Sequence, residues 1–236
     1  GVTSITGLIS DINLVLEAET DQGNSGQQID LDTNFTVTVS DTGSIAATTL
    51  TTLDGNVPGA TVTASGITTL TGTAEEIAAA ATADSNGTLV LGNFAATVSE
   101  GAVSAADLTT ISTQTSGTVN ATAATAINGT ASAVATALAD TGITHSDSFA
   151  VTLTAGSAAA TDLTAIDAAT SAVVDGSAIT TITGTAAAIA AAATLDAAPQ
   201  TTNLGNFAAT VSATASAAAD LTTISTQTSG TVNATA

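Results

Sequence analysis

Residues 108–123 read LTTISTQTSGTVNATA, and residues 221–236 read the same sixteen letters. The likeness extends outward from both copies, because LGNFAATVS also occurs twice, from Leu91 and from Leu204. Self-similarity over such a length indicates a tandem-repeat architecture, in which each unit buries its apolar face against its neighbour.

A shorter period lies inside the long one. The four phenylalanines recur at intervals of roughly 57 residues, at Phe35, Phe94, Phe149 and Phe207. We therefore expect a partial or divergent repeat over 1–34, repeats over 35–93, 94–148 and 149–206, and a partial repeat over 207–236.

Each unit is expected to hold two strand–helix steps. Residues 149–154 (FAVTLT) alternate as a strand does, and Ala160, Leu163 and Ile166 then recur at helical spacing. Further on, residues 179–183 (ITTIT) are rich in β-branched side chains, and Gly184 is expected to break that strand. Thr185 would then cap a short Ala-rich helix, as Thr73 would in a capping box with Glu76.

These steps predict an α/β solenoid in which strands stack in parallel and short helices alternate with them. Strands of successive units, with the four phenylalanines in register, would form that stack. The alternative is an all-β solenoid in which the helical segments are extended arms, an arrangement that the abundant threonine favours. The A-x-x-L-x-x-I spacing favours the first.

Composition excludes several classes of function. The 236 residues include 20 Asp and Glu but no Lys or Arg, so the formal charge is −20. Nucleic acid and anionic lipid surfaces are bound largely through Lys and Arg, and neither partner is expected here. No run of 18 apolar residues is present, so no membrane span is expected.

The wording of LTTISTQTSGTVNATA, TGTAEEIAAA and DLTAIDAATSAVV resembles the Ala/Thr-rich repeats of very long secreted surface proteins of cyanobacteria and other aquatic bacteria. The resemblance covers residues 35–236 well and 1–34 loosely. It implies an extracellular, cell-surface location and a structural role in adhesion or filament formation. It implies no active site.

One segment has the side chains of a calcium site. Asp30, Asp32 and Asn34 stand at alternate positions, so in an extended chain their oxygens share one face. Calcium takes six to eight oxygen ligands, which loop carbonyls could complete. The competing interpretation is a solvated acidic turn, and no other cofactor is expected.

The sequence offers few residues suited to catalysis. His145 is the only histidine, and a serine nucleophile needs a base beside it. The acids Asp107, Asp162 and Asp220 precede helical leucines, where the helix dipole favours a negative charge. We therefore expect a protein that is not an enzyme.

A binding module for Ca²⁺, ice or a glycan is the alternative to the structural role. The ice hypothesis rests on a row of threonines at one repeat position (Thr3, Thr68, Thr125 and Thr180) and a second row at Thr6, Thr71, Asn128 and Thr183. If these rows lay on one flat face, they could order water. The competing interpretation is a hydroxyl ladder between coils.

Self-association is the partner that the pattern predicts. The sequence begins and finishes in mid-unit, so both ends would present unpaired strand edges. We expect end-to-end contact in which Gly230–Ala236 continues into Val2–Thr6 of the next copy, as Gly117–Ala123 does into Ala126–Gly129.

Overall fold

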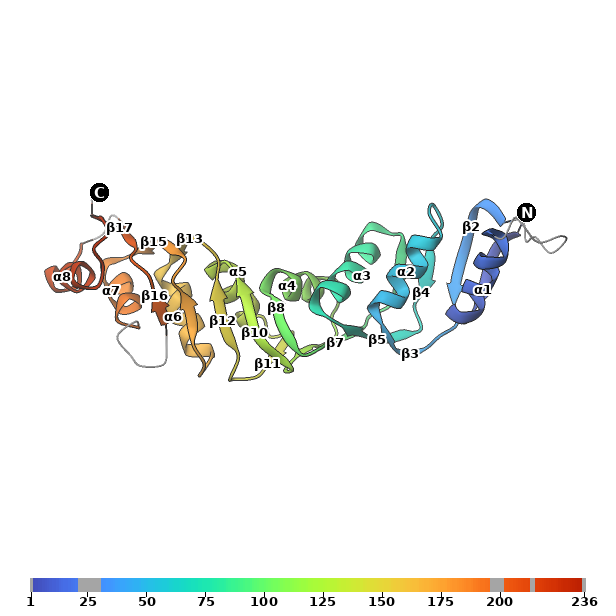
Figure 1. The fold of residues 1–236 in the computed structure, drawn as a ribbon, viewed down its shortest axis with the longest axis horizontal. Helices are drawn as coiled ribbons and strands as arrows, with labels where there is room; N and C mark the ends of the chain where they lie inside the picture. Colours follow the sequence, from blue (N-terminus) through green and yellow to red (C-terminus); the bar gives the residue numbers. More distant parts are fainter. Residues whose placement is uncertain (1, 21–30, 196–201, 213–214, 235–236) are drawn as a thin grey trace. The chain divides into compact units, whose positions relative to one another are not determined.

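Strands and short helices alternate along the whole described chain. The computed structural model describes residues 2–20, 31–195, 202–212 and 215–234. The helices are α1 (Ile9–Thr20), α2 (Ala47–Asn56), α3 (Ala74–Asn86), α4 (Ala105–Gln114), α5 (Ala131–Ala139), α6 (Ala160–Ala169), α7 (Ala186–Leu195) and α8 (Ala218–Gln227). Every strand pair whose register is defined is parallel. The fold is therefore α/β with parallel sheets, as expected (Figure 1).

Helix starts are encoded locally. At α3, the Thr73 hydroxyl accepts a hydrogen bond from the Glu76 amide at 3.2 Å, and the Glu76 carboxylate accepts one from the Thr73 amide at 2.8 Å. This is the predicted capping box. Thr185 likewise accepts from the Ala188 amide at 3.2 Å in front of α7. The strand before α7 ends at Gly184, as expected: this glycine is the last residue of the strand and has a φ of 149°, which favours glycine.

The chain forms two compact units. Residues 1–99 and 110–120 make the first, and residues 100–109 and 121–236 make the second. In the first unit, one sheet has the order β1 (Val2–Gly7), β2 (Leu31–Val39), β4 (Val62–Ala64) and β6 (Leu89–Leu91). Another has neighbours in the order β3 (Gly43–Ala46), β5 (Ile67–Gly72), β7 (Ala95–Val98) and β9 (Val119–Ala121).

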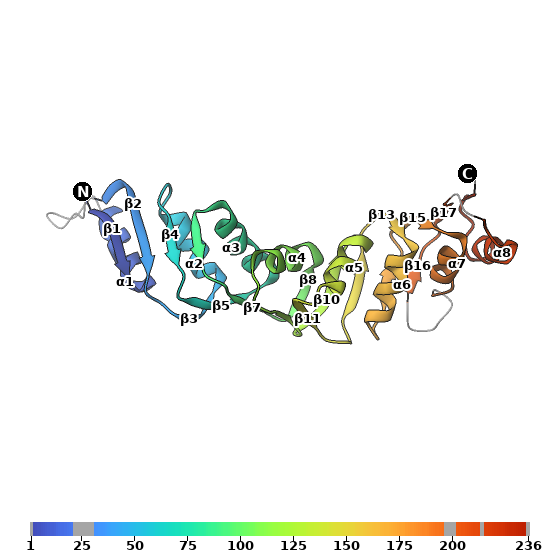
Figure 2. The same ribbon diagram turned by 180° about the vertical axis from the view of Figure 1, so that it is seen from behind.

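The second unit repeats this plan. One sheet runs β8 (Gly101–Ser104), β10 (Ala124–Gly129), β12 (Ala150–Leu153), β14 (Val174–Gly176) and β16 (Thr202–Leu204). The other runs β13 (Gly156–Ala159), β15 (Ile179–Gly184), β17 (Ala208–Val211) and β18 (Val232–Asn233), while β11 (Ile143–His145) follows α5. Helices α5, α6, α7 and α8 pack in sequence order, as do α1, α2 and α3 in the first unit (Figure 2).

The core is built of thin layers of small apolar side chains. Strand residues such as Val37, Val62 and Leu70 are fully buried against helix residues such as Leu50 and Ile77. The A-x-x-L-x-x-I pattern forms this helical face: its members in α4 and α6, Ala105, Leu108, Ile111, Ala160, Leu163 and Ile166, all have 0% exposure.

The expectation that the four phenylalanines lie in register is wrong. They lie in, or directly before, β2, β7, β12 and β17, and these strands belong to four different sheets. Within the chain, β9 and β10 follow one another in sequence, with β9 paired to β7 and β10 to β8. Equivalent positions of successive 57-residue units therefore do not stack on one another.

Candidate functional site

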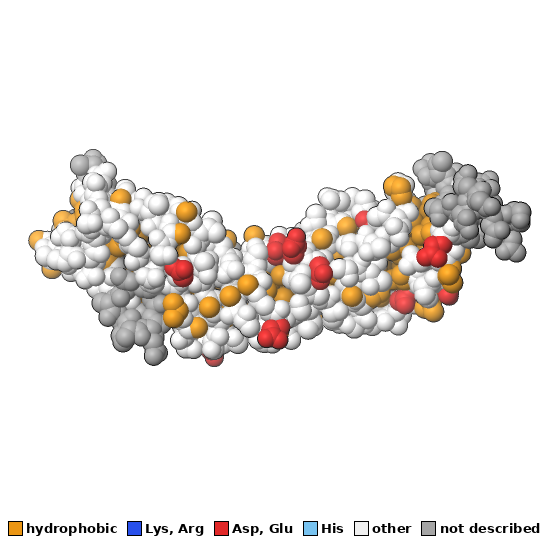
Figure 3. All heavy atoms as spheres, in the orientation of Figure 1, with side chains coloured by type: hydrophobic (Ala, Val, Ile, Leu, Met, Phe, Trp, Pro, Cys, Tyr) orange, Lys and Arg blue, Asp and Glu red, His pale blue; other side chains and the backbone are white. Residues whose placement is uncertain are grey.

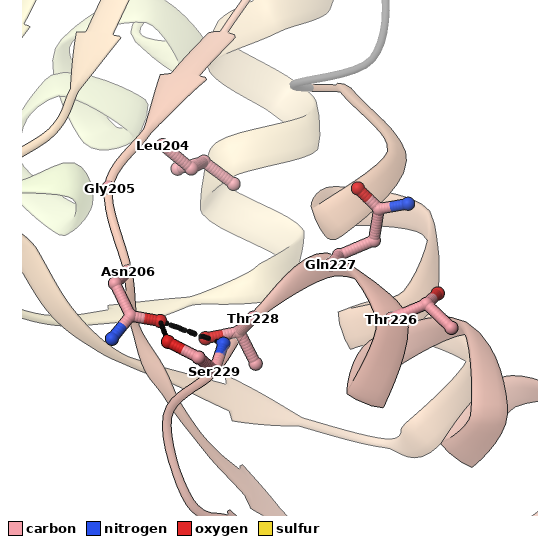
Figure 4. A pocket seen from close by; sticks show the side chains of 7 residues that line it. All are labelled: Leu204, Gly205, Asn206, Thr226, Gln227, Thr228 and Ser229. Atoms are coloured by element: carbon pink, nitrogen blue, oxygen red, sulfur yellow. Dashed lines mark hydrogen bonds between the residues drawn. The ribbon is translucent and has the colours of Figure 1, made fainter.

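The side chain of Asn206 holds together two segments of the second unit. Asn206 follows β16, and its Oδ1 accepts hydrogen bonds from the Thr228 hydroxyl and from the amide and hydroxyl of Ser229, each at 2.9 Å (Figure 4). Thr228 and Ser229 come directly after α8. We call this arrangement the asparagine clamp. It fixes the end of a helix to the loop one step earlier in the chain.

The same clamp occurs in the first unit. Asn93 Oδ1 accepts from the Thr115 hydroxyl at 3.0 Å and from the Ser116 amide and hydroxyl at 2.9 and 2.8 Å. Gly117 follows because the chain passes against the Phe94 carbonyl, where an added Cβ would lie 2.1 Å from the oxygen. Both clamps are formed by the repeated NF and TSG motifs. The contact between these two motifs was not predicted from the sequence.

A third loop–helix junction has a similar set of hydrogen bonds, but the acceptor is not an asparagine side chain. Ser171 donates from its amide and its hydroxyl to the backbone carbonyl of Asp147, both at 2.8 Å, and the Thr170 hydroxyl donates to the Phe149 carbonyl at 2.5 Å. The asparagine side chain is thus replaced by a main-chain carbonyl. A site that binds ligand through the asparagine would not survive this change, whereas a structural clamp does.

An open hollow of about 440 Å³ lies beside the clamp at Asn206. Its lining is Leu204, Gly205, Asn206, Thr226, Gln227, Thr228 and Ser229 (Figure 4). The lining carries neither a charge nor a nucleophile paired with a base. It offers amide and hydroxyl groups only, which can hold water or a neutral polar ligand but supply no general acid–base chemistry.

The predicted calcium ligands are only partly within the described chain. Asp30 lies outside the described residues, and Asp32 and Asn34 lie in β2 with side chains that are not described. Among the described residues, no group of three or more His, Cys, Asp or Glu could hold a metal ion. The calcium site stays a prediction.

His145 packs rather than pairs with a nucleophile. Its ring meets Phe149 edge-on, with centroids 5.1 Å apart and an angle of 77°, and its Nδ1 lies 2.9 Å from the Ser146 carbonyl oxygen. Asp107, Asp162 and Asp220 lie in the first turns of α4, α6 and α8, as predicted. There they complement the helix dipole.

The surroundings of Asp175 lower the pKa of its carboxyl. The hydroxyl of Ser177, at 2.6 Å, and the amide of Ser177, at 3.0 Å, hold the pKa of Asp175 below its ordinary value, against a small opposing effect of desolvation. The acids seen in Figure 3 are separate spots on an otherwise uncharged surface. No cation is available to pair with them, since the chain has no Lys or Arg.

The predicted threonine rows do not form. Thr3, Thr68, Thr125 and Thr180 lie in β1, β5, β10 and β15, which belong to four different sheets, and the second row is divided in the same way. The threonines of each row therefore do not lie side by side on one sheet, which was the arrangement that the ice hypothesis required. The structure instead places threonines of β1, β2 and β4 next to one another.

Comparison of the chain with known protein families, with curated proteins and with solved structures finds no match. Within the described ranges, no helix is long and apolar enough to span a bilayer.

Proposed function

We propose that this chain is a structural segment of an extracellular surface protein, adhesive or filament-forming, whose strand–helix steps continue as an α/β solenoid from one copy into the next. The proposal rests on one comparison inside the molecule. It concerns two stretches of identical sequence that have different surroundings.

Several apolar residues of the sixteen-residue segment are more deeply buried in its first copy than in its second. Leu108 and Val119 have 0% exposure, whereas the equivalent Leu221 and Val232 are half-buried. Just before the segment, Ala105 is fully buried and its equivalent Ala218 is exposed. Because the sequences are the same, the difference comes from what covers them, so α8 and β18 present a face suited to one more strand–helix step.

A second copy offers such a step at its first strand. Among the described strands, β1 is at the edge of its sheet and pairs with β2, and α1 follows it closely. Inside the chain, the corresponding role falls to β10, which pairs with β8 in the register Ile127 to Val103 and is followed by α5. Edge strands with free amides and carbonyls are templates for this kind of pairing. Contact between two different ends is heterologous and generates an open filament.

Charge favours this geometry over lateral aggregation. The formal charge of −20, with no cation to offset it, makes side-by-side approach repulsive. The proposed end face is made of Ala, Leu and Val, where short-range burial outweighs a repulsion that salt screens over about 10 Å at 0.1 M. The absence of Lys and Arg also removes every cleavage site for trypsin-like proteases, which suits exposure outside a cell.

The test compares two neighbouring alanines of α8. Ala218→Glu places a charge where the equivalent Ala105 is fully buried, and Ala219→Glu places one where the equivalent Ala106 is exposed. A charge buried without a partner is strongly unfavourable, so only the first variant should lose association. Both substituted positions are exposed here, so both variants should fold normally.

Sedimentation velocity over a range of protein concentrations, in high salt, measures the outcome. The unchanged chain and Ala219→Glu should form end-to-end species, while Ala218→Glu should sediment as a single copy. An unchanged chain that stays a single copy at high concentration and high salt would contradict the proposal. Equal association of the two variants would contradict the proposed face.

A further inference from the structure

The outer face of the first sheet carries a regular grid of hydroxyl groups. On β1, β2 and β4, buried residues such as Val37 and Val62 alternate with outward-facing ones. Six of the outward positions carry hydroxyls: Ser4 and Thr6 on β1, Thr36 and Thr38 on β2, and Thr61 and Thr63 on or beside β4. Exposed valines adjoin them, Val2 at the start of β1 and Val90 on β6 beside Thr63. We call the six hydroxyl-bearing residues the hydroxyl face.

The register places them in two straight rows. Thr6 pairs with Thr38, and Thr38 with Thr63. Ser4 pairs with Thr36, and Thr61 follows in the same row because Val37 pairs with Val62. Neighbouring parallel strands lie about 4.8 Å apart, which is the spacing of hydroxyls within a row. Alternate residues along a strand lie about 6.6 Å apart, which is the spacing between the two rows. The hydroxyls therefore repeat in two directions on a rigid, hydrogen-bonded sheet.

These hydroxyls are free to bind something outside the protein. Among the described residues, none donates to or accepts from the six hydroxyl groups. On other sheets some threonine hydroxyls are used internally: Thr71 donates to the Ile45 carbonyl at 3.3 Å, and Thr183 to the Ala158 carbonyl at 3.4 Å. What distinguishes the hydroxyl face is that its six unbonded hydroxyls lie side by side on three neighbouring strands.

The second unit supplies a comparison with the same fold and a different surface. On β10, β12 and β14, the corresponding outward positions are Ala126, Asn128, Ala150, Thr152, Val173 and Asp175. Only one of them has a hydroxyl, and one is charged. The parallel sheet of the second unit forms without threonine at most of its outward positions. The hydroxyls of the first unit are therefore not required by the fold.

The chemistry of the face narrows what can bind to it. The grid contains no carboxylate, although the chain has 20 Asp and Glu. A crystalline polysaccharide is recognised largely by exposed aromatic rings that pack on the sugars. The chain has no Trp or Tyr, Phe94, Phe149 and Phe207 are buried, and Phe35 on β2 is half-buried. What remains is a neutral, rigid array of hydroxyls and methyls whose hydrogen-bond partner is water itself.

We propose that the hydroxyl face binds ice. Each hydroxyl holds a water molecule at a position fixed by the sheet, and the threonine methyls limit where other water can sit. Immobilising a water molecule on a protein lowers its entropy. Waters that the sheet already holds at regular spacings in two dimensions can join an ice lattice without being ordered further. This function is separate from end-to-end association, because that contact would use the edge of β1, whereas the hydroxyl face is the outward side of β1, β2 and β4.

The experiment uses two threonines at matched positions. Thr38 is in the middle of the hydroxyl face, and Thr152 occupies the corresponding exposed place on β12, three residues after Phe149 as Thr38 is after Phe35. Thr38→Lys and Thr152→Lys introduce the same long, charged side chain. Circular dichroism and melting temperature confirm that both variants fold.

Ice-crystal shaping and inhibition of ice recrystallisation are measured in a cryostage microscope. The unchanged chain and Thr152→Lys should be active at equal concentrations, and Thr38→Lys should need about tenfold more protein, the effect of losing one well-placed contact. Unshaped crystals with the unchanged chain, or equal losses in the two variants, would overturn the proposal. Binding to cellulose or chitin particles that Thr38→Lys alone abolishes, without an effect on ice, would overturn it in favour of a polysaccharide.

Discussion

Leu108 and Leu221 are the first residues of the two identical segments, so the effect of one substitution can be compared in two different surroundings. Leu108→Ala removes a side chain with 0% exposure, and the typical cost of such a change in a packed core is about 2–5 kcal/mol of unfolding free energy. Leu221 is half-buried, so Leu221→Ala forfeits only part of the roughly 1.5–3 kcal/mol that full burial of a leucine contributes. We expect about 1 kcal/mol for Leu221→Ala, because little cavity remains at an open face.

Urea denaturation at low protein concentration and low salt measures the two costs without association. Leu108→Ala should lower the unfolding free energy at least twice as much as Leu221→Ala. When the measurement is repeated in high salt at high concentration, the two costs should converge, since association would bury Leu221. Equal costs under the first condition would refute the reasoning, because they would mean that the two leucines have the same surroundings.

Three further outcomes follow from the described contacts. Gly117→Ala should lower the unfolding free energy by about 1–3 kcal/mol because its Cβ would meet the Phe94 carbonyl, whereas Gly55→Ala, in open space within α2, should raise it by about 1 kcal/mol; urea titration of both variants checks this. The lowered pKa of Asp175 stabilises the fold above pH 3.8, and this contribution is lost as pH falls through the lowered pKa, so the stability difference from Asp175→Asn should vanish in acid melts. With 20 carboxylates and no Lys or Arg, the melting temperature should rise with salt, and a value unchanged between dilute and concentrated NaCl would contradict this.

Local features of the fold were predictable from the sequence. Helices α4 and α6 begin and end around the Ala, Leu and Ile positions of the 3.6-residue pattern, and β12 falls within residues 149–154. The caps at Thr73 and Thr185 form as predicted, since a cap depends only on residues within one turn. Such signals need no knowledge of which segments meet.

Strand pairing was not predictable in the same way. Leu70 pairs with Ala96, and Ala96 with Val119, so each strand's partners come from the half-unit before and the half-unit after. A 57-residue period therefore sends equivalent threonines to different sheets, which is why the row through Thr68 does not exist. The asparagine clamps were missed for a related reason, because Asn93 and Ser116 meet only once the helix between them has formed.

The short step between paired strands has a genetic consequence. No strand in the described sheets depends on a partner far along the chain, so a gene that gains or loses whole steps in frame yields a protein whose remaining strands still have neighbours. The identical segments at 108–123 and 221–236 mark two places between which such a change would leave the protein sequence across the junction unaltered. An exchange between them would join Gln114 to the residues that follow Gln227 without altering a single clamp or cap at the junction. Length is thus the property of this protein that inheritance can change at the least structural cost.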